Sequence, residues 1–501
     1  MKQALHWSVR HRLALFIVFA LTGLAAVLMT TRLSIAEGGM TFPFYPSFIQ
    51  VETKTPGEQP VPENWQDPEI CAGCHERQYE GWKSSMHANA FKDPVFQAEW
   101  ALGHKATDGK TLNHCGGCHT PIGIATGTVK FDPALGKHGG FTAPDIAAQG
   151  VTCDVCHTIS GSNAVHTTTG DPGNASFIMS PGRVKRATLK DSKSPFHGTE
   201  YSELHGKSAF CGNCHNIFHP DNRFPVEHTY DEWKASPYAQ QGVQCQDCHM
   251  VPVDVAIRVA REMKPARELA NHGLGGSAGA GSRIERDLVH DHGFVGGNTV
   301  IAEALGVEGA AQNKAEAIKR LQNAAELDFE IVPARGGAHQ LKVKVSNVGA
   351  GHHLPTSLTF IRQLWLEVCI TDDQGKELLS SGVTKDNRVP ADAVMFTNRS
   401  VGKDGKPTIN PWEIANFDHI NTIPPKGFRY GVYAFRLPDG AKGFKVHARL
   451  NYQSYGQDVA DKLLGAGAVT IPTVVMKELK RDYSAADLKA ANAGDGRMAL
   501  R

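Results

Sequence analysis

The sequence predicts an α+β protein of several domains, in which a mostly helical and loop-rich region precedes an antiparallel β-sandwich. Two observations lead to this fold class. Five copies of the pattern Cys-x-x-Cys-His lie within residues 71–249, and apolar and polar residues alternate over residues 328–472. The 501 residues provide enough chain for two or three such domains.

The first residues predict an export segment. Basic residues precede an apolar run at 13–29, which has about the length that a bilayer requires. Residues 34–36 also offer a cleavage site with small residues at its ends. We expect residues 1–36 to be an N-terminal membrane anchor or, as the second alternative, a cleaved signal peptide. Either segment places the rest of the chain in the periplasm or elsewhere outside the cytoplasm, and the anchor would hold it at the inner membrane.

The repeated pattern is the attachment signature of c-type haem. Random placement of the chain's 11 Cys and 24 His would produce roughly 0.01 such motifs. The two cysteines form thioethers with the porphyrin, and the histidine binds the iron. Zinc binding would not require a histidine after each second cysteine. The predicted cofactor is therefore five covalently attached haem c groups.

The motifs define the predicted attachment and proximal ligand residues. The attachment cysteines are Cys71, Cys74, Cys115, Cys118, Cys153, Cys156, Cys211, Cys214, Cys245 and Cys248. The proximal iron ligands are His75, His119, His157, His215 and His249. We expect residues 70–298 to form a pentahaem cytochrome domain whose core is the haems themselves. Residues 37–69, which are rich in Pro, Gly and Glu, predict an extended linker in front of it.

Histidines outside the motifs are candidates for the second axial position of each iron. A haem with two histidine ligands suits electron transfer, whereas an open position suits catalysis. The four candidates that we favour are His87, His197, His292 and His352. His352 lies in a glycine-flanked loop of the predicted β-domain, so ligation from there would join the two domains.

Other candidates for the second axial position remain. His205 competes with His197, His290 with His292, and His353 with His352. Seven further histidines offer no preference: His104, His114, His138, His166, His219, His228 and His272. Met86 would raise the potential of a haem that it bound, although ordinary packing is the simpler interpretation.

Two segments of the haem region resemble each other. YEGWKSSMHA at 79–88 and YDEWKASPYA at 230–239 align through Trp82 and Trp233, which sets Tyr238 where the first copy has His87. Two interpretations stay open. The segments are two similar amphipathic helices, or they are a duplicated helix that packs on haem and presents an iron ligand only in the first copy.

The rest of the chain predicts a helix and a sheet domain. Apolar residues recur at helical spacing over 299–327, and alternating strands follow over 328–472 in HQLKVKVSNV, RQLWLEVCIT, FRYGVYAFRL and FKVHARLNYQ. Cys369, the cysteine outside the motifs, follows the strand alternation and is interpreted as a half-buried thiol. Residues 473–501 predict a polar tail that is helical or frayed.

The motifs resemble those of the multihaem cytochrome superfamily that includes the tetrahaem electron acceptor of hydroxylamine oxidoreductase. The resemblance covers about 70–360 and rests on segments such as ICAGCHERQYEGWKSSMHANAF, SPFHGTEYSELHGKSAFCGNCH and NVGAGHHLPTS. It implies closely stacked haem pairs, mostly bis-histidine ligation, and the same four favoured distal ligands. Pentahaem nitrite reductase carries a lysine in one motif, and hydroxylamine oxidoreductases carry eight motifs; this chain departs from both patterns.

The main functional hypothesis is an exported or anchored cytochrome that relays electrons between redox partner proteins, with no catalytic residue assigned. The alternative is a multihaem reductase of nitrogen or sulfur oxyanions in which one haem iron has an open position. Tyr238, which stands where the first similar segment has His87, suggests this alternative. A third hypothesis gives the β-domain a partner-binding role. The net charge of +1 offers no reason to expect a nucleic-acid partner, and a homo-oligomer stays open.

Overall fold

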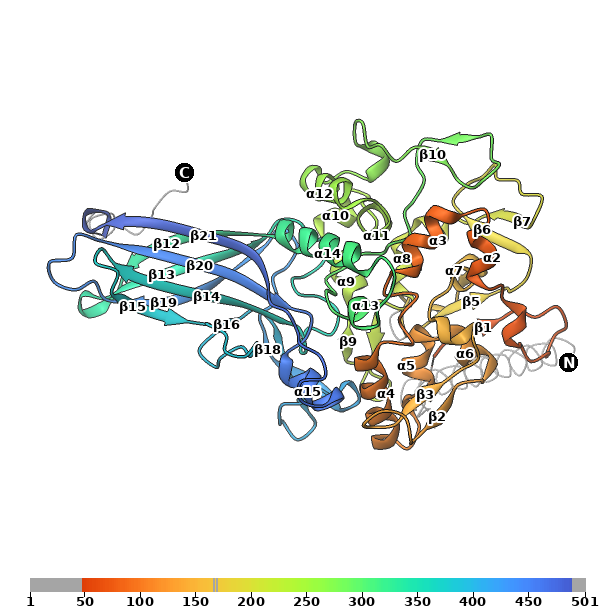
Figure 1. Ribbon diagram of the computed structural model, residues 1–501, viewed down its shortest axis with the longest axis horizontal. Coiled ribbons are helices and arrows are strands. Elements are labelled where there is room, and N and C mark those ends of the chain that lie inside the picture. Colours follow the sequence, from red (N-terminus) through yellow and green to blue (C-terminus); the bar gives the residue numbers. More distant parts are fainter. Residues whose placement is uncertain (1–46, 165–166, 168–169, 489–501) are drawn as a thin grey trace, which may run out of the picture. The chain divides into compact units, whose positions relative to one another are not determined.

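The computed structural model describes residues 47–488, apart from 165, 166, 168 and 169. The predicted export segment and His166 lie outside the described residues. Among the described residues, no helix is both long and apolar enough to span a bilayer. The described residues belong to one compact unit, in which short helices and small sheets are followed by long strands (Figure 1).

The haem region is built from short helices, as the sequence predicts. They are α2 (Pro68–Ala72), α3 (Glu76–Lys83), α4 (Pro94–Ala106), α5 (Thr111–His119), α6 (Pro121–Thr126), α7 (Cys153–His157), α8 (Ser208–Gly212), α9 (Thr229–Lys234), α10 (Pro237–Gln240), α11 (Cys245–His249) and α12 (Val253–Glu262). Single turns of 3-10 helix lie at Pro62–Asn64, Ala147–Gln149, Leu204–Gly206 and Ala266–Glu268. Helices α5, α7 and α11 each end at a motif histidine.

Small sheets connect these helices. A three-stranded sheet contains β1 (Gln50–Val51), β5 (Phe177–Met179) and β4 (Ile159–Ser162). Two-stranded sheets are β2 (Lys130–Asp132) with β3 (Gly140–Thr142), β6 (Val184–Ala187) with β7 (Gly198–Tyr201), β8 (Ile217–Phe218) with β9 (Pro225–Glu227), and β10 (Gly276–Ser277) with β11 (Glu285–Arg286). These strands could not be predicted from the sequence, because each is too short to show alternation.

Capping residues start several of the helices. Asp67 accepts a hydrogen bond from the Glu69 amide at the start of α2, and Thr152 accepts one from the Val155 amide at the start of α7. Such caps satisfy amides that have no partner within the helix. Thr152 directly precedes Cys153, and Asp67 lies one helical turn before Cys71, so each cap fixes the start of a helix that contains a motif cysteine.

Residues 47–69 differ from the extended linker that composition predicts. Strand β1 pairs in parallel with β5, Trp65 is 3% exposed, and the Gln66 amide donates to the buried carboxylate of Asp154 over 2.7 Å. Trp65 joins a hydrophobic cluster of the haem region. Proline and glycine therefore indicated irregular backbone here, but the apolar side chains between them bind the segment to the body.

The predicted helix over 299–327 is two helices. They are α13 (Ile301–Ala304) and α14 (Ala310–Ala324), separated by a turn that contains Gly306 and Gly309. Strand β12 begins directly after α14 at Ala325, three residues before the predicted start of the β-domain. The apolar side chains of a helix face and of a following strand form one continuous pattern, which hides the boundary from sequence analysis.

The last part of the chain contains two main antiparallel sheets. One has the order β12 (Ala325–Pro333), β13 (His339–Asn347), β19 (Phe428–Phe435). The other has the order β15 (Glu377–Ser381), β14 (Gln363–Asp372), β20 (Gly443–Gln453), β21 (Val474–Ser484), with β16 (Val394–Met395) also paired to β14. Strands β17 (Asn398–Gly402) and β18 (Ile414–Ile420) form a separate pair, and α15 (Gln457–Leu464) follows β20. The four predicted strands are β13, β14, β19 and β20.

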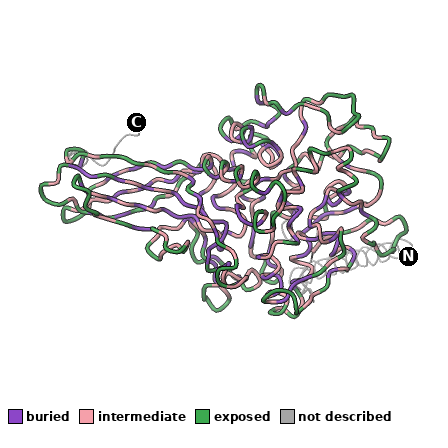
Figure 2. Tube along the Cα trace, viewed as in Figure 1, coloured by how far each residue is buried: buried purple, intermediate pink, exposed green. Residues whose placement is uncertain are grey.

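Buried residues from both main sheets belong to one hydrophobic cluster, which includes Val343, Leu366 and Leu450. Figure 2 shows these buried residues running along the strands. The mixed helix and strand content agrees with the predicted α+β fold class. Cys369 lies on β14 and is half-buried, and burial raises its pKa, as expected of a thiol without a redox role.

The predicted polar tail at 473–501 is wrong for its first part, because residues 474–484 form β21. This strand pairs along β20 and places Val474 and Met476 in the core. Its charged residues occupy the outer face, so composition alone suggested a tail. The apolar residues Val474 and Met476, followed by Leu479 and Tyr483 after one shift of the alternation, are the signal that could have identified the strand.

We expect two neighbouring substitutions to separate the core face of β21 from its outer face. Met476 is 2% exposed and Val475 is 39% exposed. Met476→Asp should lower the free energy of unfolding by more than about 3 kcal/mol, because it buries an unpaired carboxylate. Val475→Asp should cost less than about 1 kcal/mol. Urea unfolding followed by circular dichroism measures both, and equal losses would contradict the assignment of β21.

Candidate haem-binding site

One large cavity passes through the haem region. Its volume is about 2010 Å³, compared with about 300–1,000 Å³ for a pocket that holds one small ligand. All five motif histidines line it, and so do nine of the ten motif cysteines, the exception being Cys115. The space and the thiols and imidazoles around it fit several attached haems. The residues present therefore fit the cofactor that the motifs predict.

Hydrogen bonds to backbone carbonyls orient most of the motif imidazoles. These bonds join Nδ1 of His75 to Ala278 O (2.8 Å), His119 to Ala90 O (2.9 Å), His157 to Arg186 O (2.8 Å) and His249 to Val295 O (2.9 Å). A carbonyl oxygen only accepts, so Nδ1 carries the proton and Nε2 keeps its lone pair. Each of these four histidines is therefore prepared to bind a metal through Nε2.

Burial keeps the imidazoles neutral. It lowers the pKa of His87, His249 and His292 to about 3 and the pKa of His119 to about 4. Neutral imidazole is the form that binds a metal ion, so no proton competes for these sites at neutral pH.

Four motif histidines face a second imidazole across the cavity. The separations between ring centres are 6.4 Å for His75 and His197, 6.2 Å for His157 and His292, 6.3 Å for His215 and His87, and 6.3 Å for His249 and His352. Two imidazoles that bind one metal ion from opposite sides have ring centres roughly 6 Å apart, since each nitrogen lies about 2 Å from the metal. The structure thus brings each favoured distal candidate to the separation that shared ligation requires.

His157 has a second neighbour at a similar separation, His205, with ring centres 6.1 Å apart. Nε2 of His205 lies 3.0 Å from the carbonyl oxygen of Cys156, which occupies that nitrogen. Nδ1 of His292 instead lies 3.3 Å from the His290 carbonyl, and its Nε2 remains free to bind. The hydrogen bonds therefore favour His292 as the partner of His157.

A turn, rather than a helix, presents His87. Helix α3 ends at Lys83, so His87 does not share a helix with Trp82 as the sequence suggested. The His87 carbonyl accepts the Val151 amide over 2.9 Å. Gly150 has φ +71°, and a Cβ there would lie 2.5 Å from the His87 carbonyl oxygen. Only glycine allows this approach, which holds the turn in place.

The loop that carries His352 is fixed to the haem region through Glu232. Glu232 Oε2 accepts the His353 amide (3.1 Å) and the Thr356 hydroxyl (2.5 Å). Its Oε1 lies 3.3 Å from Nε2 of His228 and 3.8 Å from Nδ1 of His353. Burial raises the pKa of Glu232 to about 8 and lowers the pKa of His353 to about 4. At neutral pH this contact joins a carboxylic acid to neutral imidazoles.

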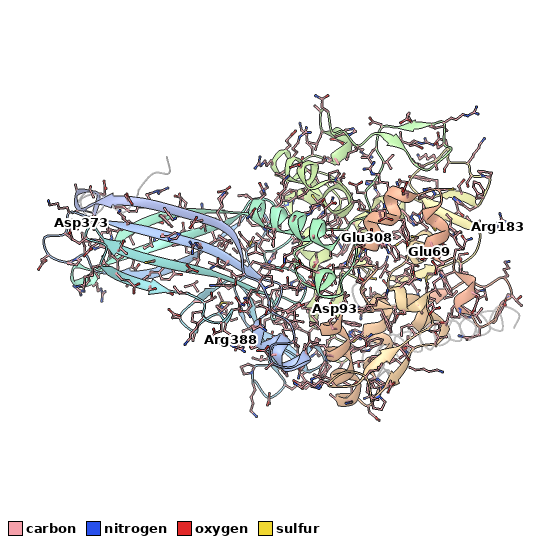
Figure 3. All side chains as sticks on the ribbon, in the orientation of Figure 1. Glu69, Asp93, Arg183, Glu308, Asp373 and Arg388 are labelled. Atoms are coloured by element: carbon pink, nitrogen blue, oxygen red, sulfur yellow. The ribbon has the colours of Figure 1, made fainter. Side chains whose placement is uncertain are left out.

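His119 differs from the other motif histidines. Its ring stacks on Phe96 with centres 3.5 Å apart, and no second imidazole faces it in the part of the chain that the structure describes. Phe96 lies in the first turn of α4, which Asp93 caps (Figure 3). Burial raises the pKa of Asp93 to about 6 and that of Glu99 to about 7. Two buried carboxyl groups near this site can therefore hold or release a proton near neutral pH.

The two similar segments occupy equivalent surroundings. Trp82 Nε1 donates to the Val151 carbonyl (2.7 Å), and Trp233 Nε1 donates to the Val243 carbonyl (2.9 Å). Each of these valines lies two residues before a motif cysteine. The segments are therefore a structural duplication that includes the haem motif after each valine, at residues 153–157 and 245–249.

Tyr238 has a structural role in this duplication. It is 1% exposed, and its hydroxyl donates to the Ala260 carbonyl over 3.0 Å, with the Val348 carbonyl at 3.3 Å. These acceptors occupy its single proton. Its motif histidine, His249, also faces His352. Tyr238 therefore gives no reason to expect an iron with an open position nearby. Among the described residues, His119 is the motif histidine without a facing imidazole.

Cysteines of different motifs also lie side by side. The thiols of Cys71 and Cys153 are hydrogen-bonded, as are those of Cys211 and Cys245. Cys118 Sγ lies 3.9 Å from the Cys214 carbonyl. The first motif is therefore next to the third, the fourth is next to the fifth, and the second is next to the fourth.

The other histidines have partners elsewhere. The pairs are His104 with the Phe131 ring (4.7 Å), His138 with Lys462 O (3.2 Å), His219 with Trp412 O (3.0 Å), His228 with Glu232 (3.3 Å), His272 with Asp287 (3.6 Å) and His290 with Met250 O (3.4 Å). His114 lies on α5, directly before the second motif. Met86 packs against a hydrophobic cluster and lines the cavity.

Glu232 makes a testable contribution to stability. Its raised pKa means that the folded protein holds a proton that the unfolded chain releases above its ordinary pKa of 4.5. Stability should therefore fall as the pH rises from about 5 to 8. Glu232→Gln should remove at least about 1 kcal/mol of this fall. Thermal unfolding at both pH values measures the effect, exposed Glu80→Gln is the control, and parallel profiles for wild type and Glu232→Gln would contradict it.

Comparisons with known proteins agree with a cytochrome. The family described as cytochrome c554 and c-prime matches residues 70–158. No curated protein matches the chain in sequence. A penta-heme cytochrome c552 from Thermochromatium tepidum shares the fold, with a TM-score of 0.57 and 19% identity, over 84% of this chain and 100% of that chain.

Two other solved structures match only a minor part of the chain. The structural genomics target SoR45 (12% identity) and the putative ApaA protein from Bordetella pertussis (14% identity) each cover 31% of this chain, and 82% and 89% of their own chains. Their TM-scores of 0.14 are too low to indicate a shared fold. The motifs, the family match and the shared fold of the pentahaem protein together support a multihaem c-type cytochrome.

Proposed function

We propose that this protein is an extracytoplasmic electron-transfer cytochrome that carries five haem c groups and relays electrons between redox partner proteins. The observation that carries the proposal is the set of four imidazole pairs with ring centres 6.2 to 6.4 Å apart. Bound haem supplies reversible one-electron chemistry. The chain's own part is to hold two neutral imidazoles to each of four irons, which leaves no position for a substrate.

The contacts between cysteines of different motifs suggest the order of the relay. The first site adjoins the third through Cys71 and Cys153, and the fourth adjoins the fifth through Cys211 and Cys245. Cys156 of the third motif is close enough to Cys214 of the fourth to affect its pKa. The proposed path therefore runs from the first site through the third and fourth to the fifth, with the second as a branch at the fourth.

The first site is the proposed port for a redox partner. Its two imidazoles are only partly buried, and Phe196, next to His197, is 70% exposed. Ile70, next to Cys71 of the same site, is 64% exposed. Electron transfer to a partner requires an accessible site, so the first site fits this role best.

The β-domain is proposed to be a β-sandwich at residues 325–484 whose main role is to supply His352. This role explains why the His352 loop is hydrogen-bonded to Glu232 of the haem region. Attachment of the chain to the inner membrane through residues 1–36, and a homo-oligomeric state, remain proposals from the sequence. Docking of a partner on the β-domain is a further option that deletion of this domain cannot test, since deletion would also remove His352.

Measuring the iron content of the protein and the spin states of its haems tests the proposed relay. Purified protein should contain five iron atoms per chain, and electron paramagnetic resonance should show at least four low-spin haems with two histidine ligands. His352→Ala should convert one of them to high spin, whereas His419→Ala, an exposed histidine on β18, should change nothing. Fewer than four low-spin haems in the wild-type protein would contradict the proposal.

The alternative, a reductase of a nitrogen or sulfur oxyanion, has one supporting observation. His119 lacks a facing imidazole among the described residues, and Asp93 and Glu99 are buried carboxyl groups near it. An open position beside groups that can donate protons is what reduction of an oxyanion requires. The alternative function therefore assigns catalysis to the second motif's haem site rather than to the surroundings of Tyr238.

Ligand binding separates the two functions. If the second site is open, the wild-type protein should show one high-spin haem that binds nitrite, hydroxylamine or cyanide, and turnover of nitrite by reduced protein should follow. Glu99→Gln should lower this turnover, because it removes a carboxyl group that can donate a proton near the second motif. Glu80→Gln, at an exposed position, is the control. Five low-spin haems in the wild type would exclude the reductase.

A further inference from the structure

A half-buried arginine lies beside the fifth haem site without a counter-charge. Arg320, on α14, lines the cavity, and its Nε is buried with no hydrogen-bond partner. Its one hydrogen bond is a long one, from Nη2 to the Val251 carbonyl over 3.4 Å. Val251 follows the fifth motif by two residues, so this bond places the guanidinium next to His249.

No carboxylate neutralises Arg320 within the described part of the chain. Glu316 lies one turn earlier on α14, but its carboxylate accepts a hydrogen bond from Gln312 over 3.2 Å and makes no ion pair with Arg320. A buried guanidinium without a partner is costly, and arginines in such positions are normally paired with a carboxylate or phosphate. The cavity side of Arg320 must therefore receive an anion.

The attached haem brings that anion with it. Each haem carries two propionate carboxylates, and the planar guanidinium presents donors that match a carboxylate. Arg320 interacts electrostatically with Cys248 and His249, both of the fifth motif. The neighbouring arginine on α12, Arg261, is exposed and donates to Asn323, so it does not compete for this role.

On the basis of the proposed relay, we propose that Arg320 binds a propionate of the haem attached at Cys245 and Cys248 and raises the reduction potential of that haem. A cation near an iron disfavours the oxidised state, which carries one more positive charge, and burial strengthens the effect. Neutralising the negative charge of a propionate also raises the reduction potential of the haem. Arg320 therefore favours the movement of electrons on the relay toward the fifth site.

The protein also offers a matched control. Lys319 is the next residue on α14, but it points to solvent and pairs with Asp254, with 46% and 74% of these side chains exposed. Lys319→Gln removes the same unit of charge from the same helix, where water and salt screen it. Arg320→Lys keeps the charge at the buried position and loses only the paired donors.

The experiment is a spectroelectrochemical titration of the full haem-loaded protein. Arg320→Gln should lower the ratio of reduced to oxidised fifth haem about tenfold at a fixed potential, which corresponds to about 59 mV for one electron. Arg320→Lys should change the ratio less than about threefold, and Lys319→Gln less than about twofold. Introducing His352→Met into each variant marks the fifth haem, since methionine ligation alters its spectrum and potential.

A second variant keeps the test valid if Arg320→Gln fails to assemble. Asn323→Asp places a carboxylate one turn away on α14, where it competes for the guanidinium, and it should lower the same potential without removing Arg320. Unchanged potential in Arg320→Gln, an equal drop in Lys319→Gln, or an equal drop in Arg320→Lys would overturn the inference. A wild type with fewer than four low-spin haems would instead contradict the proposed function, and spin states are therefore measured first.

Discussion

The arrangement of the haem region depends on hydrogen bonds that join most of the imidazole Nδ1 atoms to backbone carbonyls. Four motif histidines and three facing histidines, His197, His292 and His352, make this bond, which fixes both the ring plane and the nitrogen that remains free. The acceptor carbonyls come from distant segments, such as Ala278 for His75 and Val295 for His249. The hydrogen bonds from the imidazoles to these carbonyls therefore hold loops without regular structure in place.

This constraint explains which features the sequence could predict. The motifs identified the attachment residues because a fixed spacing of cysteine and histidine has a chemical reason. His87, His197, His292 and His352 could be selected as candidates, and the structure sets each opposite a motif histidine. The pairing itself could not be predicted, because partners such as His249 and His352 are more than 100 residues apart and only the fold brings them together.

Other features had weaker signals. Strand β21 carries mostly charged residues, and its inward apolar residues change their alternation between Met476 and Leu479, so its pattern in the sequence is weak. Arg320 has no motif around it, and its role becomes visible only when a buried guanidinium without a carboxylate is found beside the cavity. Asp93 and Glu99 likewise resemble ordinary helix residues in the sequence. Burial, which sequence composition does not report, turns them into groups that titrate near neutral pH.

The structural duplication extends to the distal histidines. Gly81 and Glu232 hold the same place in the two similar segments. A Cβ on Gly81 would lie 3.2 Å from the His292 carbonyl carbon, and Glu232 binds the amide of the residue after His352. The loops that carry His292 and His352 therefore approach equivalent positions, one by close backbone packing and the other by a hydrogen bond.

Each duplicated unit thus contains a tryptophan bound to a valine carbonyl, the motif that follows the valine, and a distal histidine from a later loop. The second motif, at residues 115–119, lies inside the first unit, between its tryptophan segment and its motif at 153–157, and has no counterpart in the second unit. The absence of an imidazole facing His119 among the described residues agrees with this difference between the units. The duplicated units therefore provide two of the four imidazole pairs, and the inserted motif is the site at which, among the described residues, no such pair forms.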